Sequence, residues 1–173
     1  NPTLTDVTIN NNTANIFGGG MSVSSSSTPT LTGVTITNNT AVNGGGMYVG
    51  SSSTPTLTDV TITNNTADSA GGGMYLYSSD PTLTNSIIWG NSPAPIYILS
   101  SGTPLITYSD IEGGWEGDGN IDVDPLFTNP ESGDYTLQED SDCIDAGTAD
   151  LDGDGIEDIT DFYGTAPDMG AFE

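Results

Sequence analysis

The sequence contains no lysine, no arginine and no histidine, whereas 24 of its 173 residues are aspartate or glutamate. Without cationic side chains, the chain has no counter-charge for a nucleic-acid backbone or for anionic lipid head groups. It also has no apolar run long enough to span a bilayer. These absences predict a protein that binds no nucleic acid and does not insert into membranes.

The same absences restrict catalysis. They exclude nucleophiles activated by histidine, histidine-ligated zinc and lyase mechanisms with a lysine or arginine base. The single cysteine, Cys143, has no disulfide partner in the chain and is expected to pack as a small apolar residue. We therefore expect that the chain is not an enzyme. The alternative is an aspartate-dependent glycan hydrolase, for which Asp110, Glu112 and Glu116 are the nearest group of carboxylates.

The first part of the chain consists of near-copies of one sequence motif, of which PTLTDVTITNNTA is an example. The copies begin at prolines spaced by 27, 26, 26 and 23 residues, namely Pro2, Pro29, Pro55, Pro81 and Pro104. A repeat of near-constant length in the twenties is typical of a solenoid, in which each unit buries its apolar side against its neighbours. The repeats therefore predict a rod.

Within one repeat, apolar residues alternate with threonine, which is the pattern of short β-strands and not of helices. In the third repeat, the inward residues are Leu57, then Val60 and Ile62, then Met74 and Leu76. This arrangement indicates three strands per turn. We predict an all-β protein: a right-handed parallel β-helix of about five rungs over residues 1–112, followed by an irregular, acidic, calcium-binding C-terminal cap over residues 113–173.

Stacked rungs bring equivalent side chains into columns. One column holds asparagines at a corner, where a ladder of side-chain amide bonds is expected: Asn12, Asn39, Asn65 and Asn91. Another holds outward tyrosines, which either contact a sugar or a partner protein or shield the sheet: Tyr48, Tyr75 and Tyr97.

The phrases PTLTDVTITNNTA and GGGMYV resemble those of secreted bacterial right-handed β-helix repeat proteins. The stretches YSDIEGGWEGDGNIDVDPLF, SDCIDAG and DMGAFE resemble the C-terminal, anchor-associated region of the same proteins. The resemblance implies the fold and an extracellular or cell-surface location. It does not imply one function, because the group includes adhesins, structural proteins and polysaccharide-active enzymes.

Acidic residues are concentrated in the second part of the chain: four precede residue 106, and the other 20 follow. There, the pattern D-x-D-x-D-G-x-x-D-x-x-D matches a calcium-binding loop, with oxygen ligands at the required spacing. The predicted ligands are Asp150, Asp152, Asp154, the Ile156 carbonyl, Asp158 and Asp161. The loop resembles those of dockerins and other extracellular calcium modules. Calcium is the expected cofactor, and the alternative is a solvated acidic turn.

A second acidic cluster has alternating oxygen ligands but no complete loop pattern: Asp118, Asn120, Asp122 and Asp124. The spacing leaves three alternatives open, which are a second calcium site, ordinary turn chemistry and a cap on the last rung.

Three N-x-T sequons recur at the same corner and are candidate glycosylation sites: Asn11, Asn38 and Asn64. Outward threonines of the T-L-T phrase form a hydroxyl grid, which resembles the arrays of ice-binding β-helices. The sequence favours an extracellular structural or adhesive protein, a calcium-stabilised stalk or filament subunit that associates end to end and contacts a glycan or protein ligand. The alternatives are a polysaccharide-binding or glycan-hydrolysing β-helix, and ice binding.

Overall fold

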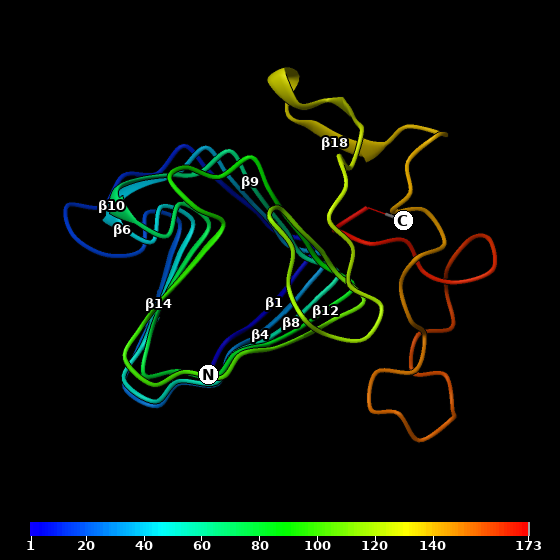
Figure 1. Ribbon diagram of the computed structural model, residues 1–173, viewed down its shortest axis with the longest axis horizontal. Helices are drawn as coiled ribbons and strands as arrows, with labels where there is room; N and C mark the ends of the chain where they lie inside the picture. The colour runs from blue at the N-terminus through cyan, green and yellow to red at the C-terminus, as the bar shows by residue number, and fades with distance from the viewer. Residues whose placement is uncertain (173) are drawn as a thin grey trace.

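The computed structural model describes residues 1–172 as a parallel β-helix with a long C-terminal segment along one side (Figure 1). Figure 1 looks along the rod, so that successive turns superimpose as a triangle. The described residues contain no helix that is both long enough and apolar enough to cross a membrane.

Three parallel sheets form the sides of the triangle. The first sheet contains β1 (Thr3–Thr5), β4 (Thr30–Thr32), β8 (Thr56–Thr58), β12 (Thr82–Thr84) and β15 (Leu105–Thr107). The second sheet contains β2 (Thr8–Asn10), β5 (Thr35–Thr37), β9 (Thr61–Thr63), β13 (Ile87–Trp89) and β16 (Asp110–Ile111). The third sheet contains β3 (Met21–Val23), β7 (Met47–Gly50), β11 (Met74–Tyr77) and β14 (Ile96–Leu99). The three strands predicted per turn are thereby confirmed.

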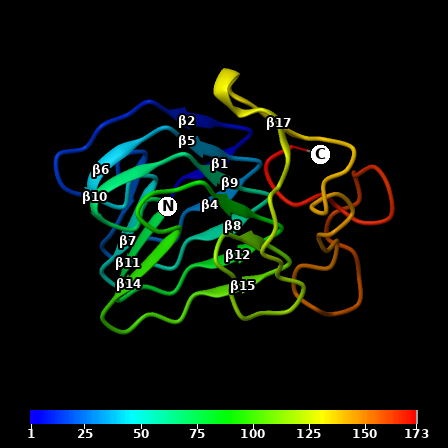
Figure 2. The same cartoon turned by 45° about the horizontal axis from the view of Figure 1, so that its top comes forward.

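A short fourth sheet, β6 (Thr40–Asn43) and β10 (Thr66–Ala70), lies between the second and third sheets in chain order. Figure 2 shows the turns stacked one below another, with the first strands of the chain at the top.

The register places like residues on like. In the first sheet Leu4, Leu31, Leu57 and Leu83 pair in sequence, and Ile106 continues the column. In the third sheet Met21, Met47 and Met74 pair in the same way. Most of these inward side chains are fully buried, and together they form one continuous core. Burial of apolar area along this column stabilises the rod, because no single turn can cover its own apolar side.

The predicted asparagine ladder is confirmed. The Asn39 side chain donates from Nδ2 to Oδ1 of Asn65 over 3.0 Å, and Asn65 donates in turn to Asn91 over 3.0 Å. A second column, which the sequence did not indicate, joins serine hydroxyls to the backbone of the turn above. There, Ser86 Oγ accepts from the Val60 N–H, and Ser109 Oγ accepts from the Ser86 N–H.

The predicted tyrosine column is also present on the outside of the third sheet. Tyr48 and Tyr75 have ring centroids 5.9 Å apart, and Tyr75 and Tyr97 have centroids 5.2 Å apart. Phe17, which lies outside the aligned phrase, extends the column at 4.5 Å from Tyr48. Tyr75 is only 8% exposed, because its neighbours in the column cover it. The stacked rings therefore shield this sheet along its length.

Residues 113–122 turn beneath the last rung and close part of that end of the rod. The Asp118 carbonyl accepts from the Tyr108 N–H, and Ile121 forms a parallel bridge with Asp110. Trp115 packs against the core from below. The predicted division at residue 112 stays a prediction, since backbone pairing with the last rung continues as far as Ile121.

The chain then returns along the side of the rod as an irregular segment (Figure 1). Its regular elements are β17 (Phe127–Asn129), the 3-10 helix η1 (Pro130–Ser132) and β18 (Asp134–Leu137), of which the two strands pair antiparallel. It is anchored on the second sheet by Cys143 and Met169, which pack against Ile87. Cys143 is fully buried, so its expected packing role is confirmed.

This segment covers threonines that point away from the β-helix core. Thr37 and Thr61 are at most 2% exposed, because Tyr135 hydrogen-bonds to the first and the Ala171 N–H donates to the second. On the first sheet, Thr84 is 7% exposed, whereas Thr3 and Thr30 remain open to solvent. The sequence predicts two columns of exposed threonines on the first sheet. Both columns are exposed only at the end of the sheet that begins with β1.

Candidate functional site

The acidic loop after Thr148 lies in the C-terminal segment, and it gathers three of the predicted ligands. Carboxylate oxygens of Asp150, Asp152 and Asp158 lie within 4.8 Å of one another. Backbone N–H groups of Asp158 and Ile159 both donate to the Ala149 carbonyl, over 2.7 and 3.0 Å, which closes the loop. Three converging carboxylates are the oxygen ligands that calcium prefers.

The loop's own N–H groups orient these carboxylates. The two oxygens of Asp150 accept from the Gly153 N–H at 2.7 Å and from the Gly155 N–H at 2.8 Å. Asp158 accepts from the Leu151 N–H at 2.9 Å. Such turns hold the side chains on the inside of the loop and leave further lone pairs for a cation.

The other two predicted carboxylates are not part of this group. Asp154 accepts from the Ile156 N–H at 2.8 Å. Asp161 lines a different hollow, next to the β-helix. The loop therefore gathers positions 1, 3 and 9 of the calcium pattern, and calcium binding by the six predicted ligands stays a prediction.

The second acidic cluster has structural partners. Asn120 continues the serine column, because its Oδ1 accepts from the Ser109 N–H at 3.0 Å. Asp122 accepts from the Gly113 N–H at 3.0 Å, and Asp124 accepts from the Leu126 N–H at 3.0 Å. These contacts fit a turn and a cap on the last rung, and calcium binding by Asp118, Asn120, Asp122 and Asp124 stays a prediction.

Asp110 is fully buried where the last rung meets the C-terminal segment. Its carboxylate accepts from the Val123 N–H at 3.2 Å and from the Cys143 thiol at 3.5 Å. Burial raises the pKa of Asp110 to about 6, with a smaller contribution from the charges of Asp122 and Asp124, although the two hydrogen bonds partly oppose the shift. Burial also raises the pKa of Cys143, which favours a neutral thiol that donates to Asp110.

The three carboxylates considered for glycan hydrolysis differ in their surroundings. Asp110 cannot reach a substrate from its buried position. Glu112 accepts from the Gly90 N–H at 2.9 Å, and Glu116 is exposed. The glycan-hydrolase alternative stays a prediction, although the burial of Asp110 does not suit an acid or base that must contact a substrate.

Asp110 leads to a prediction about pH. Since the folded pKa lies above the value of about 3.9 for an unfolded aspartate, the neutral form favours folding. Its favourable contribution is present below pH 4 and is lost as the pH rises through about 6. We expect Asp110→Asn to raise the free energy of unfolding above pH 6 by up to about 3 kcal/mol, with little effect at pH 4.

Urea unfolding of both proteins between pH 4 and 8 measures this difference. Asp118→Asn, which neutralises an exposed carboxylate nearby, is the matched control and should show a much smaller dependence on pH. A constant difference between the Asp110→Asn variant and the unaltered protein over this range would contradict the raised pKa.

A hollow that the sequence did not indicate combines carboxylates from two parts of the chain. In the repeats, the positions equivalent to Asp59 hold Asp6, Gly33 and Asn85. The C-terminal segment adds Asp161 and Asp168, so that four aspartates line a hollow of about 160 Å³. Nothing in the spacing of the repeats could reveal this meeting, because half of the group comes from outside them.

The three sequon asparagines are exposed at one corner. Asn11, Asn38 and Asn64 have left-handed backbone conformations, with φ of 55°, 55° and 56°. Asparagine adopts this conformation more readily than most residues, which accounts for their place at the turn. Their glycosylation stays a prediction.

A family model described as a right handed beta helix region matches residues 1–120. This range includes every strand of the three stacked sheets, from β1 to β16. Comparison with curated proteins and with solved structures gives no match.

Proposed function

Because the chain belongs to the right-handed β-helix family, we propose that it is an extracellular structural protein, a surface stalk or filament subunit that presents a repetitive threonine face. The proposal includes secretion, stabilisation by calcium and adhesion to a glycan or protein ligand, and it assigns the chain no catalytic role. Family membership supports the β-helical architecture. The distribution of exposed side chains on its three sheets supports the proposed contact surface.

One observation carries the proposal: the three sides of the rod are unequally covered. The C-terminal segment covers much of the second sheet, and the aromatic column shields the third. On the first sheet, the column Thr3, Thr30 and Thr56 is exposed in perfect register. A regular row of hydroxyls on a rigid sheet suits repeated weak contacts with an extended partner.

This arrangement makes ice binding the weaker alternative. The second threonine column passes from exposed Thr5 through half-buried Thr32 and Thr58 to Thr84, which is 7% exposed. A flat grid needs both columns free along the rod. We therefore propose the single exposed column as a contact surface for a macromolecule.

The predicted end-to-end association is restricted at the end of the rod that residues 113–122 cover. Residues 113–122 lie beneath β15 and β16, so a second copy cannot stack on all three sheets at that end. β14 is the outer strand of the third sheet, with Tyr97 40% and Leu99 43% exposed beside it. Its edge is the part of this end that remains suited to strand addition.

Calcium is proposed to hold the acidic loop together. The chain carries a formal net charge of −24 with no basic residue, so its carboxylates repel one another without counter-ions. A cation that binds only the folded loop stabilises the fold by about 2.7 kcal/mol when its free concentration is 100 times the dissociation constant.

We expect calcium to raise the melting temperature of chelator-treated protein, and Asp150→Asn combined with Asp152→Asn to abolish the increase. Glu139→Gln combined with Asp140→Asn removes the same charge at exposed positions and should leave the increase intact. Calorimetry with calcium, with magnesium and with chelator measures the effect. A melting temperature that is unchanged by chelation in the unaltered protein would contradict the calcium site.

The structural role is tested by electron microscopy of the native cells and their surroundings, with particle sizing of purified protein. Surface rods or fibres that contain the protein are the expected result. Their dissociation on chelation would indicate that the acidic loop and its calcium connect one subunit to the next. Exclusively monomeric protein at high concentration with calcium, and no surface structures, would overturn the proposal of a stalk or filament.

A further inference from the structure

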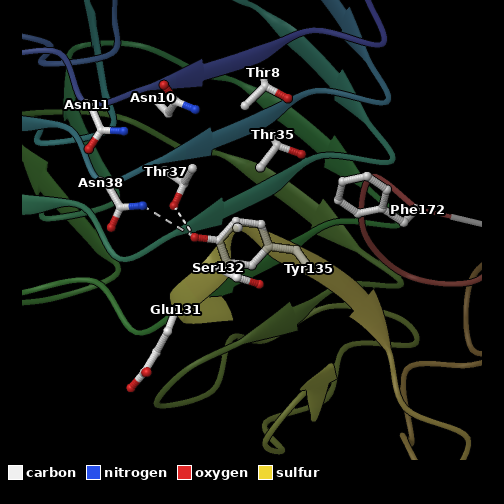
Figure 3. A pocket seen from close by; sticks show the side chains of 11 residues that line it. Thr8, Asn10, Asn11, Thr35, Thr37, Asn38, Glu131, Ser132, Tyr135 and Phe172 are labelled. Atoms are coloured by element: carbon white, nitrogen blue, oxygen red, sulfur yellow. Dashed lines mark hydrogen bonds between the residues drawn. The ribbon is translucent and has the colours of Figure 1, made fainter. Parts of the chain in front are cut away.

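A further hollow lies between the second sheet and the C-terminal segment (Figure 3). It has a volume of about 400 Å³, within the range of about 300–1,000 Å³ found for small-molecule sites. One side is formed by β2, β5 and the corner that follows them, and the other by η1, β18 and the end of the described chain. Its lining includes Thr8, Asn11, Thr35, Asn38, Tyr135 and Phe172.

Hydroxyl and amide groups dominate this lining. Thr8 and Thr35 are register partners on neighbouring strands, and their side chains stand in a row in Figure 3. Asn11 and Asn38 form a second row at the corner. Threonine hydroxyls donate and accept, and asparagine amides offer two donors and one acceptor oxygen. The hollow thus presents mixed donors and acceptors at regular spacing.

Several of these polar groups have no protein partner within residues 1–172. Thr37 bonds to the Tyr135 hydroxyl at 2.6 Å, and Asn38 donates to the same oxygen at 3.4 Å. By contrast, no hydrogen bond joins the hydroxyl of Thr35 to residues 1–172, and Thr35 lines the hollow. A hydroxyl that faces a hollow can donate to and accept from a polar ligand. Thr35 is therefore available to hydrogen-bond to an occupant of the hollow.

Aromatic rings supply the apolar part of the wall. Tyr135 is 2% exposed and is held by an edge-on contact with Phe127, with ring centroids 5.3 Å apart. The half-buried Phe172 lies next to Thr35 at one end of the hollow (Figure 3). An apolar wall with a few fixed polar groups is the usual composition of a small-molecule site. Here it suits a ligand with both hydroxyl groups and C–H faces.

The charges around the hollow indicate whether its ligand is charged or neutral. Among residues 1–172, Glu131 is the only carboxylate in the lining, and the chain has no cationic side chain to bind an anion. We propose that this hollow binds an uncharged carbohydrate, a short saccharide whose hydroxyls bond to Thr8, Thr35 and the corner asparagines while a ring face lies against Phe172. This site goes beyond the proposed structural role and does not depend on calcium or on the first sheet.

The test is isothermal titration calorimetry of the full chain, with excess calcium, against cellobiose, maltose, lactose and chitobiose, and against digalacturonate as the anionic probe. The protein is produced without glycosylation, so that Asn11 and Asn38 carry no sugar. At least one neutral disaccharide is expected to bind, and digalacturonate is expected to bind more weakly than it.

Thr35→Val removes the hydroxyl and keeps the shape, and we expect it to weaken that binding about 10-fold, the effect of one lost hydrogen bond. Thr35→Ser keeps the hydroxyl and should retain affinity, while Thr54→Val, at an exposed position outside the hollow, should change nothing. Binding of no neutral disaccharide, stronger binding of digalacturonate, or equal affinity of Thr35→Val and unaltered protein would each overturn the proposal. None of these outcomes bears on the chelation test of the structural role.

Discussion

Replacing Asn65 with alanine is expected to lower the free energy of unfolding by roughly 4 kcal/mol, because the change removes a buried amide that hydrogen-bonds to both neighbouring turns. Asn65 lies in the middle of the asparagine ladder and is 1% exposed. Its Oδ1 accepts from the backbone N–H and from the side-chain amide of Asn39, each over 3.0 Å. Its Nδ2 donates to the carbonyls of Ile36 and Thr63 and to Asn91.

Alanine at this position removes five side-chain hydrogen bonds to groups of three turns in a buried corner. Each buried unsatisfied group costs about 1–3 kcal/mol, so several of them approach the net stability of about 5–15 kcal/mol that is typical of a domain. Because the ladder joins successive turns, the loss should also reduce the cooperativity of unfolding along the rod.

Urea unfolding followed by circular dichroism measures the change. Asn12→Ala is the matched control, since Asn12 belongs to the same column but is exposed. Its effect should stay below about 1 kcal/mol. Equal losses for the two variants would show that the ladder contributes little to the stability of the rod.

Gly45→Ala is expected to cost about 3 kcal/mol or more, because the rungs approach too closely there for any side chain. An added Cβ would overlap the carbonyl oxygen of Thr66 and would lie 2.7 Å from the carbonyl oxygen of Gly72. Both atoms are backbone, so they cannot move without separating the turns. The Gly45 N–H donates to the Gly71 carbonyl over 3.1 Å, and this bond would be strained as well.

The melting temperature and the urea midpoint of Gly45→Ala measure this cost. Gly113→Ala separates the overlap from backbone strain, because Gly113 has a φ of 84° but an added Cβ would meet nothing within 4 Å. That control should lose only the cost of a left-handed conformation, about 1–2 kcal/mol. If Gly45→Ala were the milder variant, the close stacking of the turns at the glycine corner would be contradicted.

These two positions are related to the proposed function through the stiffness of the rod. A stalk transmits force along its axis, and both the amide ladder and the close glycine contacts join one turn to the next in that direction. The exposed threonine column remains a regular row only while the turns keep this register.

The sequence by itself determined how the turns stack. Equivalent residues recur at about 26 positions, so the pairing of Leu31 with Leu57 and of Met47 with Met74 follows from the repeat alone. The asparagine ladder follows in the same way, because a polar residue that returns at one corner has its own copy as the nearest partner. Each of these contacts joins equivalent residues of neighbouring repeats, so the repeat length alone predicts which residues pair.

Only the tertiary structure decided which faces are free and where the polar groups of the C-terminal segment lie. Thr61 is buried by a residue 110 positions away, and Asn85 bonds to Thr148 over a separation of 63. The segment contains no copy of the repeat, so nothing in its sequence states which strands it will cover. The burial of Asp110, the meeting of Asp161 with Asp59 and the hollow beside Thr35 all depend on that docking. Periodic contacts are local in the solenoid and can be inferred from spacing, whereas the docking of one aperiodic segment depends on the whole folded surface.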